Sequence, residues 1–149
     1  MAAWPLFSVR GRAALPPGVE GRPVRIQLDD GALQTIPGDE RADATVAEDK
    51  SAAAQELIRE TPQGRAVPVI FVVVGILSIP VIWDTIREML RRQYYGGVIV
   101  DARQTPALIT HDKTLPAEIV LFIGADGKSQ KYGARNFSED ILLKLSKAP

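Results

Sequence analysis

The stretch VPVIFVVVGILSIPVIW, residues 67–83, carries no charged side chain, and its conformation decides the fold of the 149-residue chain. From Ala66 to Trp83 the uncharged run has 18 residues, which as an α-helix would extend about 27 Å. The hydrocarbon core of a bilayer is about 30 Å thick, and spans of about 17 residues occur. The run therefore predicts a single transmembrane helix, in which glycine and proline are tolerated.

The alternative for this run is a pair of buried strands, Val67–Val74 and Leu77–Trp83, joined near Gly75. Val and Ile dominate the run, and both favour strands. Against this alternative, Pro68 and Pro80 fall inside the two proposed strands, where proline removes a ladder hydrogen bond. The membrane span is the favoured interpretation, and a buried core at residues 67–83 is the alternative.

The residues after the run predict an amphipathic helical neck that ends at Gly96. Apolar residues recur at spacings of three and four from Ile79 to Leu90, which is one face of a helix. Glu88 and Arg92 form a favourable i,i+4 pair. Aromatic and basic side chains around the end of a span favour the headgroup region. The membrane-interface candidates are Trp83, Arg87, Arg91, Arg92, Tyr94 and Tyr95.

The flanks of the run predict small units on either side of the membrane. Residues 1–22 are assigned as a flexible tail, 23–38 as a β-hairpin because Val24, Ile26 and Leu28 alternate with polar residues, and 39–65 as a polar helical connector. Residues 66–95 are the transmembrane helix with its neck. The fold class is thus a single-span helix flanked by small α+β units.

Residues 96–149 predict an α+β unit that ends in a β-hairpin and a helix. Strands are expected at Gly97–Ala102, Ala107–Thr110, Glu118–Ile123 and Ser129–Tyr132, and Ser138 is placed to cap a last helix. Four basic residues follow the span closely and three precede it, which favours a cytoplasmic C-terminal unit. The expected location is a membrane, the bacterial inner membrane, with the C-terminal unit in the cytoplasm.

The composition excludes several kinds of chemistry. Acidic and basic residues balance at 18 each, so no net charge draws the chain to nucleic acid. The chain has no cysteine and one histidine, His111, which leaves no thiol nucleophile, thiolate metal site or multi-histidine metal site. No cofactor, metal or catalytic residue is predicted.

Three local motifs resemble functional sites, but each has features that favour a structural role. GADGKS, residues 124–129, ends like a phosphate-binding loop, but Phe122 stands where that motif needs glycine. His111 and Asp112 are adjacent on a loop, so they are not expected to form an acid–base pair. The acidic pairs at residues 29–30 and 39–40 lack the ligand spacing of a calcium loop.

The segment LPAEIVLFIGADGKSQKY, residues 115–132, resembles the closing strands of thioredoxin-like domains, with Pro116 where that family has its cis-proline. The CxxC motif of the family is absent, so redox activity does not carry over. The order of the elements, with a strand, a helix, an apolar stretch, arginines, further strands and a last helix, is similar to that of small bacterial conflict-system accessory components.

The sequence therefore predicts a non-enzymatic single-pass membrane protein that acts as an accessory, anchoring or adaptor component of a membrane-associated assembly. Its expected partners are the lipid bilayer and an unidentified protein, and not nucleic acid. A partner strand is expected to add to Gly97–Ala102 or Ser129–Tyr132; captured partners that survive charge substitutions on both edges would contradict this. The alternatives are a soluble α+β binding domain with residues 67–83 as its core, or a bacterial immunity or conflict-system accessory protein.

Overall fold

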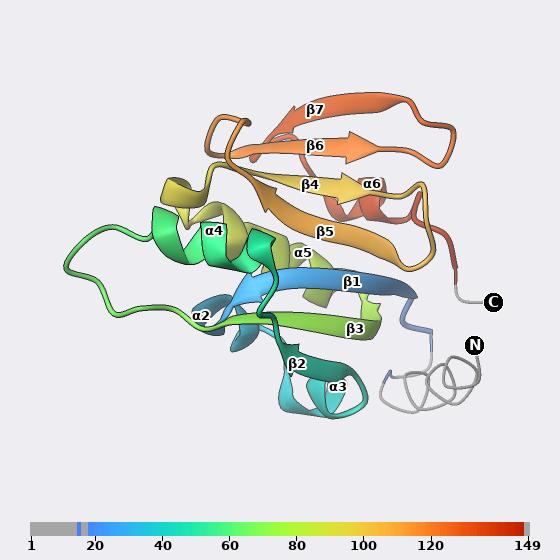
Figure 1. The fold of residues 1–149 in the computed structure, drawn as a ribbon. Helices are drawn as coiled ribbons and strands as arrows, with labels where there is room; N and C mark the ends of the chain where they lie inside the picture. Colours follow the sequence, from blue (N-terminus) through green and yellow to red (C-terminus); the bar gives the residue numbers. More distant parts are fainter. Residues whose placement is uncertain (1–14, 16–17, 148–149) are drawn as a thin grey trace.

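The computed structural model describes Leu15 and residues 18–147, so most of the predicted tail at residues 1–22 lies outside the described part of the chain. The described residues form one mixed sheet of seven strands in the order β2-β3-β1-β5-β4-β6-β7 (Figure 1). The strands are β1 (Gly21–Asp29), β2 (Thr45–Glu48), β3 (Ile70–Ser78), β4 (Gly97–Asp101), β5 (Ala107–Asp112), β6 (Ile119–Ile123) and β7 (Ser129–Gly133).

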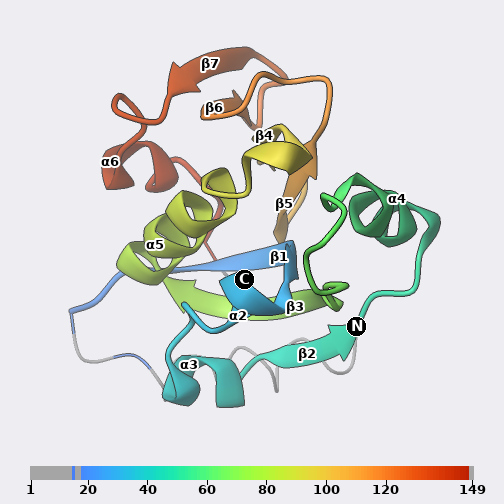
Figure 2. The same ribbon diagram turned by 90° about the vertical axis from the view of Figure 1, so that its left-hand side faces the viewer.

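The helices are distributed unequally over the two faces of this sheet (Figure 2). They are α2 (Asp30–Leu33), α3 (Gly38–Ala42), α4 (Ala52–Glu60), α5 (Ile79–Leu90), the 3-10 helix η1 (Gln93–Tyr95) and α6 (Glu139–Leu142). Figure 2 shows α5 and α6 on one face, which we call the α5 face, and α4 on the opposite face, which we call the α4 face.

The predicted transmembrane helix is wrong. The run at residues 67–83 forms β3 and the first turns of α5, and among residues 18–147 no helix is long and apolar enough to cross a membrane. The single-span fold class is therefore replaced by the mixed sheet. The inner-membrane location and the cytoplasmic side of the C-terminal unit are withdrawn with it, because both rested on the span.

The two prolines that argued against strands lie outside the strand that forms. Pro68 precedes β3, and Pro80 lies in the first turn of α5, where its missing N–H costs nothing and no kink follows. Ser78 ends β3 and caps α5, because its Oγ accepts a hydrogen bond from the Val81 N–H at 3.4 Å. Buried Glu40 fixes this turn, since it accepts hydrogen bonds from the N–H and the Oγ of Ser78.

The N-terminal strand prediction is confirmed, but the predicted hairpin is wrong. Val24, Ile26 and Leu28 are fully buried on one face of β1, and Arg25 between them is exposed. After β1 the chain enters α2 because the Asp29 side chain accepts a hydrogen bond from the Ala32 N–H at 2.8 Å and caps the helix. The antiparallel partner of β1 is β3, nine residues in register.

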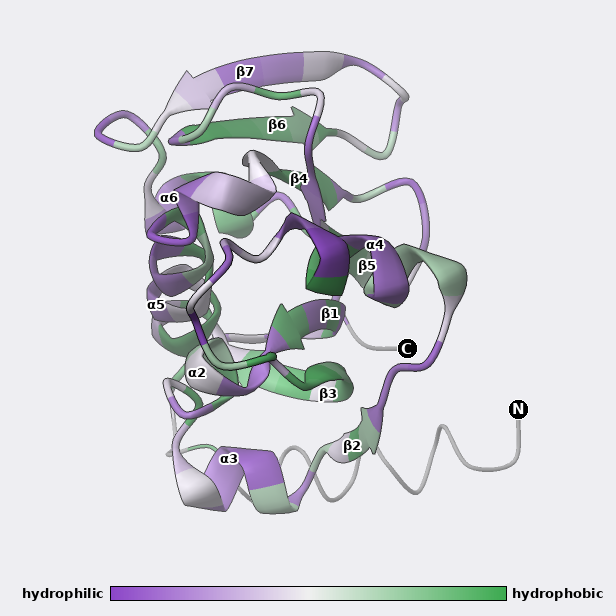
Figure 3. Ribbon diagram, turned by 60° about the vertical axis from the view of Figure 1, so that its left-hand side comes forward, coloured by the Kyte–Doolittle hydropathy of each residue, from purple (hydrophilic) through white to green (hydrophobic). Residues whose placement is uncertain are grey.

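The main core lies between the sheet and the helices of the α5 face. The predicted apolar face of α5 is confirmed, because Ile82, Ile86 and Met89 are fully buried there. They pack in the same cluster as the buried residues of β1 and of the C-terminal strands. In Figure 3, β3 and β6 are mostly hydrophobic and β7 is mostly hydrophilic, as expected for central and edge strands.

The strands predicted for residues 96–149 form, and the turn at residues 124–128 joins β6 and β7 as a hairpin. However, β4 pairs on both sides, so the expected open edge at Gly97–Ala102 is wrong. The edge at β7 is present; that a partner strand binds there stays a prediction. The cis peptide bond of the described residues precedes Pro106, so Pro116 does not match the thioredoxin-like cis-proline.

The sheet consists of two groups of strands that meet along a short junction. The N-terminal group is β2-β3-β1, the C-terminal group is β5-β4-β6-β7, and the parallel contact between β1 and β5 joins them. This contact has three residue pairs, from Val24↔Ala107 to Ile26↔Ile109, whereas β1 and β3 share nine. Beyond Ile26 and Ile109 the two strands are no longer paired. We call the place where they separate, between residues 27–29 of β1 and residues 110–112 of β5, the fork.

Candidate functional site

The α4 face is hollowed where the two strand groups meet. Two cavities of about 490 and 290 Å³ lie beside α4. Gln27, Ala53 and His111 line both cavities, so the two adjoin at these residues. We call the two adjoining cavities together the junction groove. It draws side chains from β1, α4 and β5, which come from distant parts of the sequence.

The larger cavity is lined by apolar and polar side chains. The apolar ones are Val72 of β3, Leu108 of β5 and Pro106. The polar ones come from β1, β5 and the loops: Arg25, Gln27, Asp49, Ser51, Gln104 and Thr110. Concave sites with apolar surface and a few placed polar groups are typical of small-molecule binding.

The smaller cavity extends the groove along α4 toward its C-terminal end. Leu57 of α4 and the Tyr95 ring supply its apolar surface. Charged residues line its rim: Glu56, Glu60, Asp112 and Lys113. Lys113 is already paired, because its Nζ lies 2.5 Å from a carboxylate oxygen of Glu60. The contact ties β5 to α4 across the groove.

Asp49 is held in a fixed position at the start of α4. Its Oδ2 accepts a hydrogen bond from Gln27 Nε2 at 2.7 Å, and its Oδ1 accepts one from the Ser51 N–H at 2.9 Å. Partial burial raises the pKa of Asp49, but these hydrogen bonds and the charge of Arg25 outweigh it, so the pKa lies below its ordinary value. The carboxylate is therefore ionised and oriented at neutral pH.

His111 borders both cavities and sits in the fork between β1 and β5. Both of its ring nitrogens are buried, and neither has a hydrogen-bond partner among the described residues. Its ring contacts that of Tyr95, with centroids 4.9 Å apart. Burial lowers the pKa of His111 from its ordinary 6.5 to about 4; the charge of Asp29 opposes this shift and that of Arg92 reinforces it. The imidazole is therefore neutral at pH 7.

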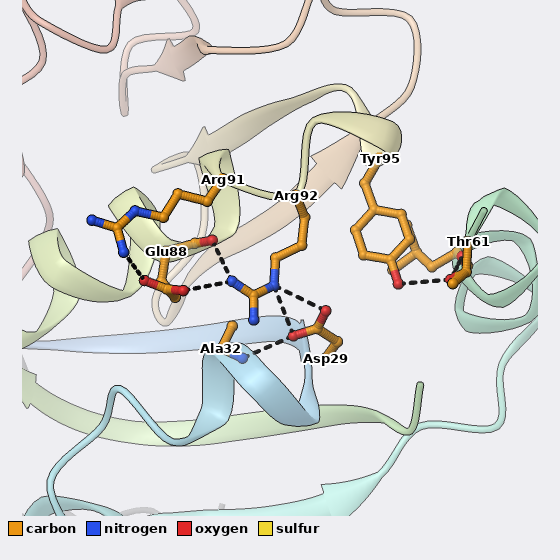
Figure 4. Close-up of polar contacts among 8 residues, drawn as sticks. Asp29, Ala32, Thr61, Glu88, Arg91, Arg92 and Tyr95 are labelled. Carbon is orange, nitrogen blue, oxygen red and sulfur yellow. Dashed lines mark hydrogen bonds and ion pairs between the residues drawn. The ribbon is translucent and has the colours of Figure 1, made fainter. Parts of the chain in front are cut away.

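The Tyr95 ring that contacts His111 lies beside a set of polar contacts, and we call Tyr95 and these residues together the wall (Figure 4). Arg92 Nε donates to both carboxylate oxygens of Asp29, at 3.2 and 3.0 Å, and its Nη1 lies 2.7 Å from Glu88. The Tyr95 and Thr61 hydroxyls are hydrogen bonded at 3.1 Å. Burial raises the pKa of Tyr95 to about 12, so its hydroxyl stays protonated.

The six residues predicted at a membrane interface fall into two places, neither of which is the end of a span. Trp83 packs on Phe137 with ring centroids 5.4 Å apart, and the Arg87 guanidinium lies 5.6 Å above the Trp83 ring. These two residues and Arg91 line a shallow depression of about 320 Å³ on the α5 side. Both arginines have acidic partners on α5 itself, Asp84 and Glu88.

The other three residues of that prediction lie behind the junction groove. Arg92 belongs to the wall described above, Tyr95 is fully buried, and Tyr94 stacks edge-on against it with centroids 4.3 Å apart. The predicted Glu88–Arg92 pair is confirmed at 2.7 Å. Gln27, Asp49 and the groove itself were not predicted from the sequence, in which the polar alternation in β1 is the one available signal.

The structure does not bring an acid–base pair together around His111. Asp112 Oδ1 accepts hydrogen bonds from the N–H and the Oγ1 of Thr114, and Lys113 is paired with Glu60. Tyr132 of β7 contacts Phe137, with ring centroids 5.9 Å apart. Within residues 18–147 no group of three or more metal-binding side chains is found.

Comparison of the chain with protein family models, with curated proteins and with solved structures found no match. The geometry of the junction groove is therefore what indicates a function.

Proposed function

We propose that this protein is a non-enzymatic binding domain that takes a small organic ligand in the junction groove. The observation that carries the proposal is the pair of adjoining cavities, about 490 and 290 Å³, that share Gln27, Ala53 and His111 in their linings. Each is of the size order of small-molecule sites, which run from roughly 300 to 1,000 Å³. Most residues from 70 to 82, in β3 and α5, are buried, which supports a core there in agreement with the binding-domain alternative.

The groove offers such a ligand three kinds of contact. Val72 and Leu108 supply apolar surface for its body. Arg25 and ionised Asp49 supply one charge of each sign, so a ligand with both a donor and an acceptor group fits better than a simple anion. Ser51 and Thr110 add hydroxyl groups. A binding role agrees with this arrangement, because hydrogen bonds from Gln27 and from the Ser51 N–H hold the Asp49 carboxylate in one orientation.

The test is an NMR titration of the folded chain at pH 7 with a set of small carboxylates, amides and heteroaromatic fragments. Fragments that bind are expected to shift the backbone amides of Gln27, Ala53 and Thr110. The Ala53→Trp variant fills the point where the two cavities meet, so it should weaken binding by at least tenfold. Ala52→Trp is the matched control, since Ala52 is exposed on the same helix and lines neither cavity.

Two results would contradict the proposal. One is that no fragment shifts the groove amides, or that shifts cluster instead at the depression beside Trp83. The other is that Ala53→Trp and Ala52→Trp bind the same fragments equally well. Preserved amide spectra of both variants show that either result reflects binding and not unfolding.

A further inference from the structure

His111 lies where β1 and β5 separate, and its two ring nitrogens have no hydrogen-bond partner among the described residues. It follows the last β1–β5 pair by two residues, and its partner on the other side is Val98 of β4. Its ring rests on Tyr95 and borders the junction groove. A buried donor and acceptor left unpaired are costly, so this position is tolerable for the neutral ring and unsuitable for the charged one.

The charged groups around the ring differ between its two sides. Behind it, Asp29 of β1 is already engaged by Arg92, and the protonated Tyr95 hydroxyl carries no charge. On the groove side, α4 presents Glu56 and Glu60, and the strand of His111 itself continues into Asp112 and Lys113. Glu60 is shared with Lys113, and Glu56 is shared with Arg59. The larger cavity adds Asp49, together with Arg25 of β1. The groove side therefore has four carboxylates, whereas the two carboxylates of the wall, Asp29 and Glu88, are both paired with Arg92.

We propose that His111 is an acid-sensitive gate of the junction groove: on protonation its ring leaves Tyr95, turns toward the carboxylates of α4 and occupies the groove. The movement exchanges a buried position without partners for one beside anions and water. Because the ring borders both cavities, it blocks the point where they meet. The gate depends on the geometry of the fork and not on a bound ligand, so it stands even if the ligand-binding proposal fails.

The test is an NMR pH titration of the ligand-free chain from pH 7.5 to 3. The His111 ring carbons are expected to titrate with a midpoint at least one pH unit below 6.5. The amides of Ala53 and Leu57 and the Tyr95 ring should shift with the same midpoint, and the nuclear Overhauser effect between the His111 and Tyr95 rings should disappear below it. In His111→Phe the ring stays apolar, so the shifts at Ala53 and Tyr95 at that midpoint should be absent.

A pair of charge-neutralising variants tests the direction in which the ring turns. Glu56→Gln removes a carboxylate from the groove side and should lower the His111 midpoint by several tenths of a pH unit. Glu139→Gln is the matched control, because Glu139 is exposed at the start of α6. The proposal is overturned if the Tyr95 contact survives protonation, if the shifts persist in His111→Phe, or if the two glutamine variants change the midpoint equally.

Discussion

The two faces of the sheet are formed by the same strands, but they differ in how completely helices cover them. On the α5 face, β1 presents Val24, Ile26 and Leu28, all fully buried. On the α4 face the same strand presents Arg25 and Gln27, and the helix above them leaves a groove. The α5 face therefore stabilises the fold, whereas the α4 face positions polar groups and is less completely packed.

The helices explain this difference. α5 has 12 residues and buries seven of them, whereas α4 has nine and buries two, Ala54 and Leu57. Those two join Ile70 and Tyr95 in a separate small cluster. A helix that buries few side chains covers little of the sheet beneath it, and the uncovered remainder is the junction groove.

The largest expected effect tests whether the α5 face carries the stability. Ile86→Ala removes a fully buried side chain of α5 and should lower the free energy of unfolding by about 4 kcal/mol, because it leaves a cavity in the main core. Urea denaturation measures this. Val67→Ala is the control, since Val67 is 76% exposed despite belonging to the same apolar run. A cost for Ile86→Ala as small as that of Val67→Ala would contradict the assignment of the main core.

The second prediction concerns the acid sensitivity of the α4 face. The pKa of His111 is about 4 in the folded chain, against 6.5 ordinarily. The unfolded state therefore takes up the proton first, so stability is highest above pH 6.5 and falls as the pH drops from 6.5 to 4. The loss is up to about 3 kcal/mol, at about 1.4 kcal/mol per pH unit of difference.

Urea denaturation of the wild type and of His111→Phe at several pH values measures this loss. The two chains share all their carboxyl groups, so the difference between their curves isolates His111. The variant should be more stable than the wild type at pH 4. Parallel curves for the two chains from pH 7 to 4 would show that His111 is not held buried and neutral.

The third prediction tests the wall next to His111, through its ion pair between Asp29 and Arg92. Asp29→Asn weakens the ion pair with Arg92 and should cost about 2 kcal/mol, because the pair is largely buried and the hydrogen bonds are charge-assisted. Asp30→Asn changes the exposed neighbouring residue and should cost less than about 0.5 kcal/mol. Thermal and urea unfolding of the pair check this, and equal costs would show that the wall contributes nothing.

The smallest effects are expected at the outer surface of α5. Arg87 and Arg91 are 51% and 69% exposed and pair with acids on their own helix. Such surface pairs contribute little, so Arg87→Ala and Arg91→Ala should each change the free energy of unfolding by less than about 0.5 kcal/mol. A loss above 1 kcal/mol in urea denaturation for either variant would mean that this surface is also part of the stabilising core.

Local patterns predicted many of the elements correctly. The alternation around Ile26 identified β1, the three-and-four spacing up to Leu90 identified α5, and the turn at Gly127 placed the β6–β7 hairpin. These succeeded because hydrophobic periodicity and turn residues act over a few neighbouring positions. The prediction for residues 67–83 failed because an uncharged run satisfies a bilayer and a buried strand equally well. The prolines that seemed to decide it lie just outside β3.

The candidate site was much less predictable. Nothing near His111 in the sequence indicates that its ring meets Tyr95, or that Gln27 of β1 reaches Asp49 beside α4. These contacts join separate elements, and the groove they border also needs the β1–β5 pairing, which joins residues more than 80 positions apart. Long-range pairing of this kind is set by the whole arrangement of strands, and no local pattern encodes it.

The sequence by itself determined which segments are apolar, which alternate and which turn, because those properties follow from each side chain and its close neighbours. The tertiary structure alone decided that the uncharged run divides into β3 and α5. It also decided that Asp29 meets Arg92 and that His111 lies unpaired in the fork. The physical reason is that backbone hydrogen bonds and buried charges need partners, and the folded chain supplies these from distant parts of the sequence.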